Sequence, residues 1–399
     1  MHKLTIKDIT VENKRVFVRV DFNVPLSGNG EVLDDYKIRA TLPTLQYLID
    51  NNAYIILASH LGRPDGSVVE ELRMDPVAQR LSELLGQNVV KADTVIGDEV
   101  ENKVNNLQPG ELLLLENVRF EPGEENNDPQ LASEMARLAQ VYVNDAFGTS
   151  HRAHASTYGV ALHLPAVAGL LMEKEITYLS KVRENPSRPM VAVLGGKKVA
   201  DKIGVIRSLI NQADALLLGG AMANTFLVAR GLSPGDSLFE KDKIELAREL
   251  MEEASKNNIQ LLLPRDVVIV QELAENAPSK VVGVEQIPEG WSAVDIGDKT
   301  IDVYQEIIDR AGMIVWNGPM GAYELPPFNN GTEMIARAIA ESDAESVVGG
   351  GDIAAALETL GFSDKVTHLS TGGGAVLDFW EGKDLPGVKI LKEPSSVKG

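Results

Sequence analysis

Short, almost continuous apolar stretches of strand length recur along the chain, with longer segments of helical periodicity between them. The stretches that we expect to form strands are residues 15–20, 54–59, 112–115, 141–144, 190–194, 215–218, 261–264, 313–316, 347–349 and 366–369. Continuous apolar strands, rather than alternating ones, are typical of parallel sheets buried on both faces. The sequence therefore predicts an α/β fold with doubly wound parallel sheets.

Helical periodicity marks the segments that should cover those sheets. Apolar residues recur at helical spacing in residues 42–51, 75–86, 131–140, 201–211, 241–257, 300–310 and 332–341. Strands and helices therefore alternate through the whole chain, as expected for an α/β fold.

At roughly 150 residues per domain, the length of 399 residues suggests two domains or three. Residues 170–184 have the pattern of one amphipathic helix, and the proline-containing residues 185–189 then interrupt the chain. We expect an N-terminal domain over residues 1–170, a connecting helix and linker over 171–187, a C-terminal domain over 188–380 and a tail over 381–399.

Acidic residues exceed basic ones by 58 to 38, which gives a net charge of −20. This balance argues against a nucleic-acid binder, and the 44% of hydrophobic residues excludes intrinsic disorder. The absence of cysteine excludes disulfides, thiolate zinc sites and a cysteine nucleophile. We see no signal peptide and no stretch long enough to span a bilayer, so we expect a soluble, cytoplasmic protein.

Basic residues gather where the strands of the N-terminal half end, which is the side where open α/β sheets bind ligands. The set comprises Arg19, Arg39, His60, Arg63, Arg119 and Arg152. Arginine suits bidentate binding of carboxylate or phosphate. Any one of these arginines is more simply explained by a surface salt bridge, but the whole set predicts a small polyanionic ligand held inside an acidic protein.

Glycines occupy the corresponding positions in the C-terminal half. They lie in the stretches 195–202 (GGKKVADK), 219–222 (GGAM), 317–321 (NGPMG), 349–352 (GGGD) and 371–374 (TGGG). Glycine lets the backbone approach a ligand closely, and amide groups at a helix N-terminus bind phosphate. One such turn is usually a helix cap, but five at successive strand ends predict nucleotide binding.

Several common motifs do not fit this chain. It contains no P-loop and neither the HRD nor the DFG motif of protein kinases. Gly349, Gly351 and Ala354 match a dinucleotide fingerprint formally, but the acidic residue expected about 20 positions further on is missing, which argues against a dehydrogenase. His151 and His154 have a spacing possible for metal ligands, but no nearby residue completes the set.

In order along the chain, these motifs resemble those of the phosphoglycerate kinase family over essentially its full length. The matching stretches are residues 19–25 (RVDFNVP), 59–64 (SHLGRP), 116–120 (ENVRF), 144–147 (NDAF), 151–154 (HRAH), 195–202, 316–319 (WNGP), 349–352 and 370–374 (STGGG). The resemblance implies two Rossmann-like domains joined by a hinge that closes, a tail that returns to the N-terminal domain, and a monomer. It also implies reversible transfer of a phosphoryl group from 1,3-bisphosphoglycerate to Mg-ADP, which gives 3-phosphoglycerate and Mg-ATP in glycolysis and gluconeogenesis.

The resemblance also assigns candidate site residues by motif. Phosphoglycerate would be held by Asp21, Asn23, Arg39, His60, Arg63, Arg119 and Arg152. The nucleotide would be held by Lys198, Lys202, Gly219, Gly220, Leu238, Asn317, Glu324, Gly350, Gly351, Asp352 and Ile353, with Asp352 serving Mg²⁺ directly or through water. The catalytic residues would be Arg39, Lys198 and Gly373.

The expected phosphoryl transfer requires the protein to position the substrates and to neutralise charge. The acceptor carboxylate is already ionised at neutral pH, so no general base is needed. In this interpretation Arg39 orients the carboxylate, Lys198 follows the transferring group, and the amides of residues 372–374 contribute a helix dipole.

Three departures from the family pattern affect the nucleotide site. Lys197 stands where a small residue is usual, Ile353 stands where a threonine hydroxyl is usual, and Ala293 or Val294 replaces a glycine near the base. The extra ammonium of Lys197 either compensates for the hydroxyl missing at Ile353 or is simply solvated.

A non-catalytic binder of nucleotide and sugar phosphate is the alternative function, and Ile353 is its only support in the sequence. The presence together of Arg39, Lys198 and Asp352 argues against this alternative, because a sensor does not need all three.

Overall fold

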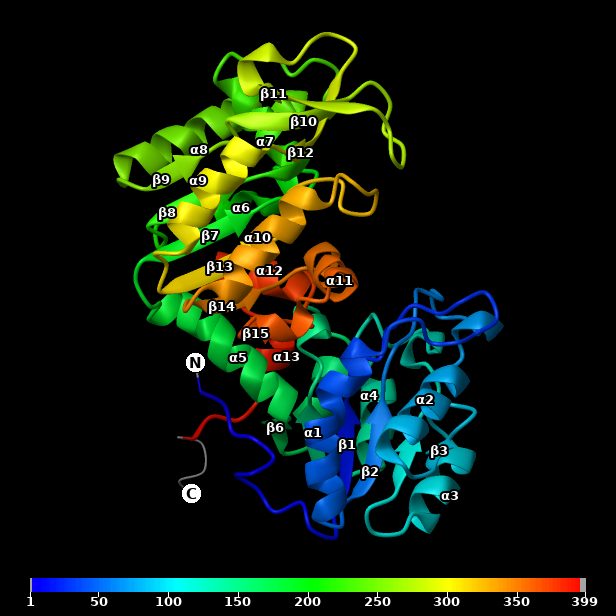
Figure 1. Cartoon of the computed structure of the whole chain (residues 1–399). Helices are drawn as coiled ribbons and strands as arrows, with labels where there is room; N and C mark the ends of the chain where they lie inside the picture. The colour runs from blue at the N-terminus through cyan, green and yellow to red at the C-terminus, as the bar shows by residue number, and fades with distance from the viewer. Residues whose placement is uncertain (1, 395–399) are drawn as a thin grey trace. The chain divides into compact units, whose positions relative to one another are not determined.

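The computed structural model describes residues 2–394 and divides into two compact units. The first unit combines the residues up to Thr177 with those from Asp384 onward, and the second comprises Tyr178–Lys383 (Figure 1). The division falls inside helix α5 (Leu170–Glu184), which coincides with the amphipathic helix predicted from the sequence.

The first unit is built on a six-stranded, wholly parallel sheet in the order β3-β4-β2-β1-β5-β6. The strands are β1 (Arg15–Arg19), β2 (Tyr54–Ala58), β3 (Val89–Lys91), β4 (Leu112–Leu114), β5 (Val141–Asn144) and β6 (Ala166–Ala168). The helices are α1 (Tyr36–Asp50), α2 (Asp75–Leu85), α3 (Asp98–Asn106), α4 (Pro129–Arg137) and α13 (Pro386–Lys389). The chain reverses its direction of winding at the centre, where β1 lies between β2 and β5.

The central strands of this sheet are buried on both faces, as their continuous apolar sequence predicted. Val16, Phe17 and Val18 of β1 have no exposed surface, and helix α1 packs its apolar side on the same core through Ile38 and Leu45. Burial of this kind fixes the carboxyl ends of β1, β2 and β5 side by side, which is where a ligand site is expected in a doubly wound sheet.

The second unit contains a second six-stranded parallel sheet, in the order β15-β14-β13-β7-β8-β9. The strands are β7 (Met190–Leu194), β8 (Ala215–Leu218), β9 (Gln260–Leu262), β13 (Met313–Asn317), β14 (Glu345–Val348) and β15 (His368–Leu369). The helices are α6 (Ile203–Ile210), α7 (Gly220–Ala229), α8 (Ile244–Lys256), α9 (Asp298–Ile308), α10 (Asn330–Glu341), α11 (Gly351–Leu360) and α12 (Gly374–Glu381). The α/β class with two parallel sheets is confirmed.

A small antiparallel sheet in the second unit was missed by the sequence reasoning. It consists of β10 (Asp266–Val270), β11 (Ser279–Gly283) and β12 (Ser292–Ile296), with β10 in the middle (Figure 1). Strand β11 is largely exposed and carries no continuous apolar stretch, so it lacks the pattern that identified the parallel strands.

The C-terminal segment from residue 384 onward is hydrogen-bonded into the first unit. The amide of Leu4 donates to the carbonyl of Lys392 at 2.8 Å, and the amide of Gly387 donates to the carbonyl of Ser150 at 2.9 Å. Between residues 2 and 394, no helix has the length and apolar character needed to cross a membrane.

Candidate functional site

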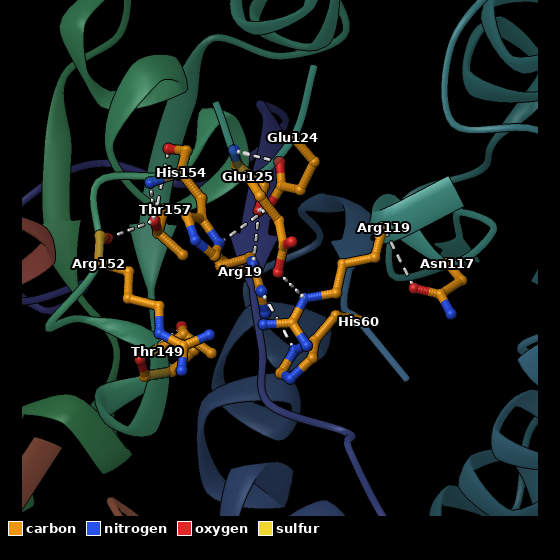
Figure 2. Close-up of polar contacts among 12 residues, drawn as sticks. Arg19, His60, Asn117, Arg119, Glu124, Glu125, Thr149, Arg152, His154 and Thr157 are labelled. Atoms are coloured by element: carbon orange, nitrogen blue, oxygen red, sulfur yellow. Dashed lines mark hydrogen bonds and ion pairs between the residues drawn. The ribbon is translucent and has the colours of Figure 1, made fainter. Parts of the chain in front are cut away.

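The first unit gathers basic side chains at the carboxyl ends of β1, β2 and β5 (Figure 2). Arg19 ends β1, His60 follows β2, and Arg119 lies on a short 3-10 turn after β4. All three are almost completely buried. Arg63 and Arg152, predicted for the same site, are exposed on the turns that follow β2 and β5. The structure thus separates a buried basic layer from an exposed one.

The sequence reasoning expected the Arg19 side chain on the rim of the sheet. The side chain instead turns into the protein, and only 1% of it is exposed. Its Nε donates to the Ser156 hydroxyl at 2.7 Å, its NH1 donates to the carbonyl of Val20, and its NH2 lies 3.3 Å from Nδ1 of His60. A residue at the end of a strand can face either side, and the sequence pattern did not settle which side Arg19 faces.

The turn that carries His60 and Arg63 is held by side chains from two other segments. Gly62 adopts φ +64°, which suits glycine. Its amide donates to Oδ1 of Asn23 at 2.9 Å, and its carbonyl accepts from NH1 of Arg119 at 2.8 Å. Asn23 and Arg119, both predicted to bind substrate, therefore also shape the loop in which His60 sits.

Positive charge in this cluster is only partly compensated. Burial lowers the pKa of Arg119 from its usual value, and the nearby Arg19 and Arg152 add to this effect. The carboxylate of Glu125 pairs with Nε of Arg119 at 3.1 Å from a half-exposed position. Burial also lowers the pKa of His154 to about 4. Buried cations without full pairing attract an anion of matching size.

Lys37, rather than Arg39, contacts the predicted substrate residue Asp21. The Nζ of Lys37 lies 3.0 Å from Oδ2 of Asp21, and Lys37 together with the other nearby cations holds the pKa of that buried carboxyl well below its usual range despite burial. Positions 37 and 39 are about 200° apart around helix α1. Arg39 accordingly faces a different direction and pairs with Asp35 at 2.7 Å, which also binds Arg80.

The second unit brings its glycine turns together through backbone hydrogen bonds. The amide of Gly196 donates to the carbonyl of Pro319 at 2.9 Å, and the amide of Gly220 donates to the carbonyl of Met320 at 2.8 Å. A Cβ at Gly350 would lie 2.7 Å from the side-chain nitrogen of Asn317, and Gly350 has φ +124°. These contacts require glycine because the turns after β7, β8, β13 and β14 approach one another at backbone distance.

Lys202 and Asn317 form a polar pair in the centre of this edge. The Lys202 ammonium donates to Oδ1 of Asn317, whose amide group donates to the carbonyl of Gly349. Burial lowers the pKa of Lys202 to about 8, although the Asp352 and Asp201 carboxylates act in the opposite direction. The predicted residues Lys202, Asn317 and Asp352 are therefore close enough to interact electrostatically.

The other predicted nucleotide residues lie on the same loops or beside them. Lys198, Glu324, Leu238, Gly351 and Asp352 are exposed, and Gly373 with φ +50° caps helix α12. Gly219 immediately precedes helix α7 and lies against Met320. Two of the residues that depart from the family pattern also lie here. Lys197 is exposed, and the Ala293 amide donates to the hydroxyl of Ser237, the neighbour of Leu238, at 2.8 Å.

Ile353 is fully buried in the first turn of α11. Its side chain packs beside the glycine edge, because its Cγ2 lies 3.6 Å from the position of a Cβ built at Gly350. The role of Ile353 in nucleotide binding and the compensation by Lys197 stay predictions.

Four polar residues of the first unit's cluster were missed by the sequence reasoning: Lys37, Glu124, Glu125 and Ser156. Glu124 and Glu125 come four and five residues after Phe120, the end of the ENVRF stretch, and two adjacent acids close to a group of arginines are a signal that the sequence does carry. Ser156 offers no such signal, because its position beside Arg19 follows from the fold alone.

A sequence profile described as Phosphoglycerate kinase matches residues 6–383. The chain belongs to the phosphoglycerate kinase family. Phosphoglycerate kinase from Moorella thermoacetica is 55% identical over 393 residues, which cover 98% of this chain and 100% of that one. The resemblance inferred from the motifs is confirmed, and the dehydrogenase interpretation of the Gly349 motif is set aside.

Solved phosphoglycerate kinase structures share the fold over almost the whole chain. The structure from Coxiella burnetii has a TM-score of 0.88 at 42% identity and covers 98% of both chains. The structure from Pyrococcus horikoshii OT3 has a TM-score of 0.85 at 33% identity, with 97% of this chain and 98% of that chain covered. The chain is therefore a glycolytic phosphotransferase with a carboxyl acceptor, a phosphoglycerate kinase.

Proposed function

We propose that the two units divide the phosphoglycerate kinase reaction between them. The basic cluster of the first unit holds 3-phosphoglycerate or 1,3-bisphosphoglycerate, and the glycine edge of the second unit holds ADP or ATP. The observation that carries this division is the buried basic layer of Arg19, His60 and Arg119, in which the carboxylate that pairs with Arg119, Glu125, is itself half-exposed. The glycine edge differs in character, with backbone amides and one partly buried ammonium, that of Lys202.

The phosphate of phosphoglycerate is anchored by His60, Arg63, Arg119 and Arg152. Arg119 is buried and fixed by its bond to Gly62, so it offers a preorganised fork, whereas the exposed Arg63 and Arg152 can close over a ligand. These contacts are made far from the reacting carboxylate and are similar in the ground and transition states.

The carboxylate end of the substrate is oriented by Asn23, Asp21 and a cation on helix α1. The sequence motif assigned this cation to Arg39, but the contact with Asp21 favours Lys37. Asp21 fixes the Lys37 ammonium, and the partly exposed ammonium retains room for a second anion. We therefore assign the carboxylate contact to Lys37 and leave Arg39 as a nearby charge held by Asp35.

The polyphosphate of the nucleotide is bound by Lys202, Asn317 and the backbone of residues 350–353. The amides of Gly351, Asp352 and Ile353 begin helix α11, where the helix dipole favours a phosphate. Lys202 contributes the single charge, and the bond to Asn317 directs it. Leu238, Gly219, Gly220 and Glu324 would border the base and ribose.

The residues present fit a magnesium ion that arrives with the nucleotide. Asp352 is exposed in the first turn of α11 and interacts with Lys202, so one carboxylate faces the phosphate position. Within residues 2–394 no group of three or more His, Asp and Glu side chains could hold a metal by itself. This composition is typical of Mg²⁺ bound through one carboxylate and substrate phosphates. When bound, the ion neutralises charge on the phosphate oxygens.

Transfer itself is assisted by Lys198 and by the N-terminus of helix α12 at Gly373. Both belong to the second unit, and the exposed Lys198 is able to follow the moving phosphoryl group. Because the substrates bind to different units, turnover requires these units to bring them within reacting distance, so closure is a step of the reaction. We further propose that the enzyme acts as a monomer in the cytoplasm.

Two measurements test this division. In a coupled assay, ADP formation from ATP should depend strictly on 3-phosphoglycerate. By titration calorimetry, His60→Ala should weaken only phosphoglycerate binding and Lys202→Met only nucleotide binding. Arg15→Ala is the control, because Arg15 lies outside the cluster and bonds to Asn105. Loss of nucleotide affinity in His60→Ala with intact folding would contradict the assignment of substrates to units.

A further inference from the structure

Arg19 is the most deeply buried arginine of the cluster, and each of its three nitrogens already has a partner in the protein. Nε bonds to Ser156, NH1 to the carbonyl of Val20, and NH2 to His60. With 1% of its surface exposed, Arg19 has no access to a bound substrate. Its function must therefore be exerted through one of these partners.

The contact with His60 fixes where the imidazole carries its proton. A guanidinium has five N–H donors and no acceptor. The 3.3 Å contact between NH2 of Arg19 and Nδ1 of His60 is thus a hydrogen bond only when Nδ1 is the acceptor. The ring proton then sits on Nε2, and protonation of both nitrogens would place two donors against each other.

The buried carboxylate of Glu124 is linked to Arg19 through the Ser156 hydroxyl. The Ser156 hydroxyl accepts from Nε of Arg19 at 2.7 Å and donates to Oε1 of Glu124 at 2.5 Å, and the Ser156 amide donates to the other carboxylate oxygen at 2.9 Å. Glu124 has no exposed surface. Figure 2 shows Arg19 between Glu124 and His60.

We propose that Glu124, Ser156 and Arg19 form a positioning chain that holds His60 as the neutral tautomer with its proton on Nε2. His60 then presents an N–H donor to the phosphate of phosphoglycerate without adding a further charge. This inference rests on the proposed substrate site, in which His60 is a phosphate ligand. It assigns Arg19 to the orientation of His60, and not to contact with the substrate.

The other charged groups around His60 agree with a neutral ring. Asp21 favours the protonated imidazolium, whereas Arg19, Arg119 and Lys37 disfavour it, and burial is the largest effect. Together they lower the pKa of His60 well below its usual value. Burial and these cations therefore favour the neutral ring, which leaves the tautomer as the property to be controlled.

The tautomer can be measured directly in the intact, ligand-free enzyme. Two-bond proton–nitrogen correlation spectra of histidine-labelled protein, with His60→Gln for assignment, should show Nε2 protonated and Nδ1 unprotonated at pH 7. Arg19→Lys and Ser156→Ala should produce a mixture of tautomers, and Ser82→Ala should not. Ser82 is the matched control because its hydroxyl bonds to the Ala78 carbonyl and the Val89 amide, outside the chain.

Steady-state kinetics distinguish a loss of His60 orientation from a general loss of folding. A misoriented donor to a charged group costs about one order of magnitude in affinity. Ser156→Ala should therefore raise KM for 3-phosphoglycerate about tenfold with little change in kcat, leave KM for ATP unchanged and unfold at a nearly parental temperature. Glu124→Gln should show the same selectivity.

Two spectroscopic results would overturn the positioning chain. One is a parental His60 with Nδ1 protonated or with both nitrogens protonated at pH 7. The other is an unchanged Nε2–H tautomer in Ser156→Ala and in folded Arg19→Lys. Because the tautomer is read without substrate, its failure is distinct from failure of the substrate site. That second failure would appear as His60 resonances that do not move when 3-phosphoglycerate is added.

Discussion

The Lys37 ammonium lies 3.0 Å from the Asp21 carboxylate, at the end of strand β1 and the first turn of helix α1. In our proposal, this pair makes Lys37 the cation of α1 that meets the substrate carboxylate. We expect Lys37→Ala to lower kcat by about two orders of magnitude, as for loss of one charge contact in a transition state. Lys37→Arg should retain most of the activity, and Arg39→Ala should have the smaller effect in steady-state kinetics.

Thermal unfolding serves as the control for this comparison, because loss of Lys37 leaves Asp21 buried without its partner. The double substitution Lys37→Ala with Asp21→Asn restores neutrality and should recover stability but not activity. A larger loss of kcat in Arg39→Ala than in Lys37→Ala would return the catalytic assignment to Arg39.

Lys198→Ala should lower kcat by two to three orders of magnitude while the dissociation constants of both substrates change little, because its contact is made with the transferring group. Rapid-quench measurement of the transfer step tests this expectation. Lys197→Ala is the matched control, since the neighbouring lysine is equally exposed and has no role in our proposal. Equal effects of the two substitutions would show that only the overall charge of the loop matters.

Lys202 couples nucleotide binding to pH. Burial lowers its pKa to about 8, so the ammonium loses its proton above that pH in the free enzyme. A bound polyphosphate favours the charged form, and binding above pH 8 must then take up one proton. The dissociation constant of Mg-ADP should rise roughly tenfold per pH unit above 8. Calorimetry in buffers of different ionisation enthalpy measures the proton uptake, which should be absent in Lys202→Met.

The same lysine should reduce the stability of the free enzyme. Below pH 8 its charge is present in both the folded and the unfolded chain, so the full penalty of burial applies there. The penalty is relieved as the pH rises from 8 to 10.5, the usual pKa of lysine. Lys202→Met should raise the free energy of unfolding by about 1–3 kcal/mol at pH 7. A destabilised Lys202→Met would show that the Asn317 contact outweighs the burial cost.

Gly350→Ala should damage the nucleotide edge without removing any functional group. Its φ of +124° is unfavourable for alanine, and the added Cβ would meet the side-chain nitrogen of Asn317 at 2.7 Å. We expect a loss of about 1–3 kcal/mol in stability and a weaker affinity for ATP. Gly351→Ala, where the added Cβ meets open space, should behave like the parent in both measurements.

The alternation of apolar stretches and helical segments was sufficient to predict both parallel sheets. Strands such as Met190–Leu194 and Ala215–Leu218 were predicted with the bounds observed, because their burial on both faces leaves a continuous apolar signal. In the β10–β12 sheet, Ser279–Gly283 escaped because it stays largely exposed beside its antiparallel neighbour, whereas the buried apolar stretch of β10 was a signal that the sequence reasoning overlooked. Local sequence does not encode pairing of that kind.

The candidate site could be predicted as far as its loops, but not as far as the direction of each side chain. The motifs placed Arg19 and Arg39 at the correct strand end and helix start. The structure then turned Arg19 inward and directed Arg39 toward Asp35. Ile353 shows the same limit, because its burial depends on how α11 packs. The direction of a side chain is set by tertiary packing, which a sequence motif does not report.

The backbone bond between Leu4 and Lys392 has a consequence for biosynthesis. Residues 4–177 leave the ribosome first. The unit that they form then still lacks helix α13 and Lys392, whose carbonyl accepts from the amide of Leu4. The second unit, which is continuous in sequence, has all its residues before the first does. The second unit can therefore complete its fold before the first unit, which must wait for the segment from residue 384 onward to pair with its N-terminus.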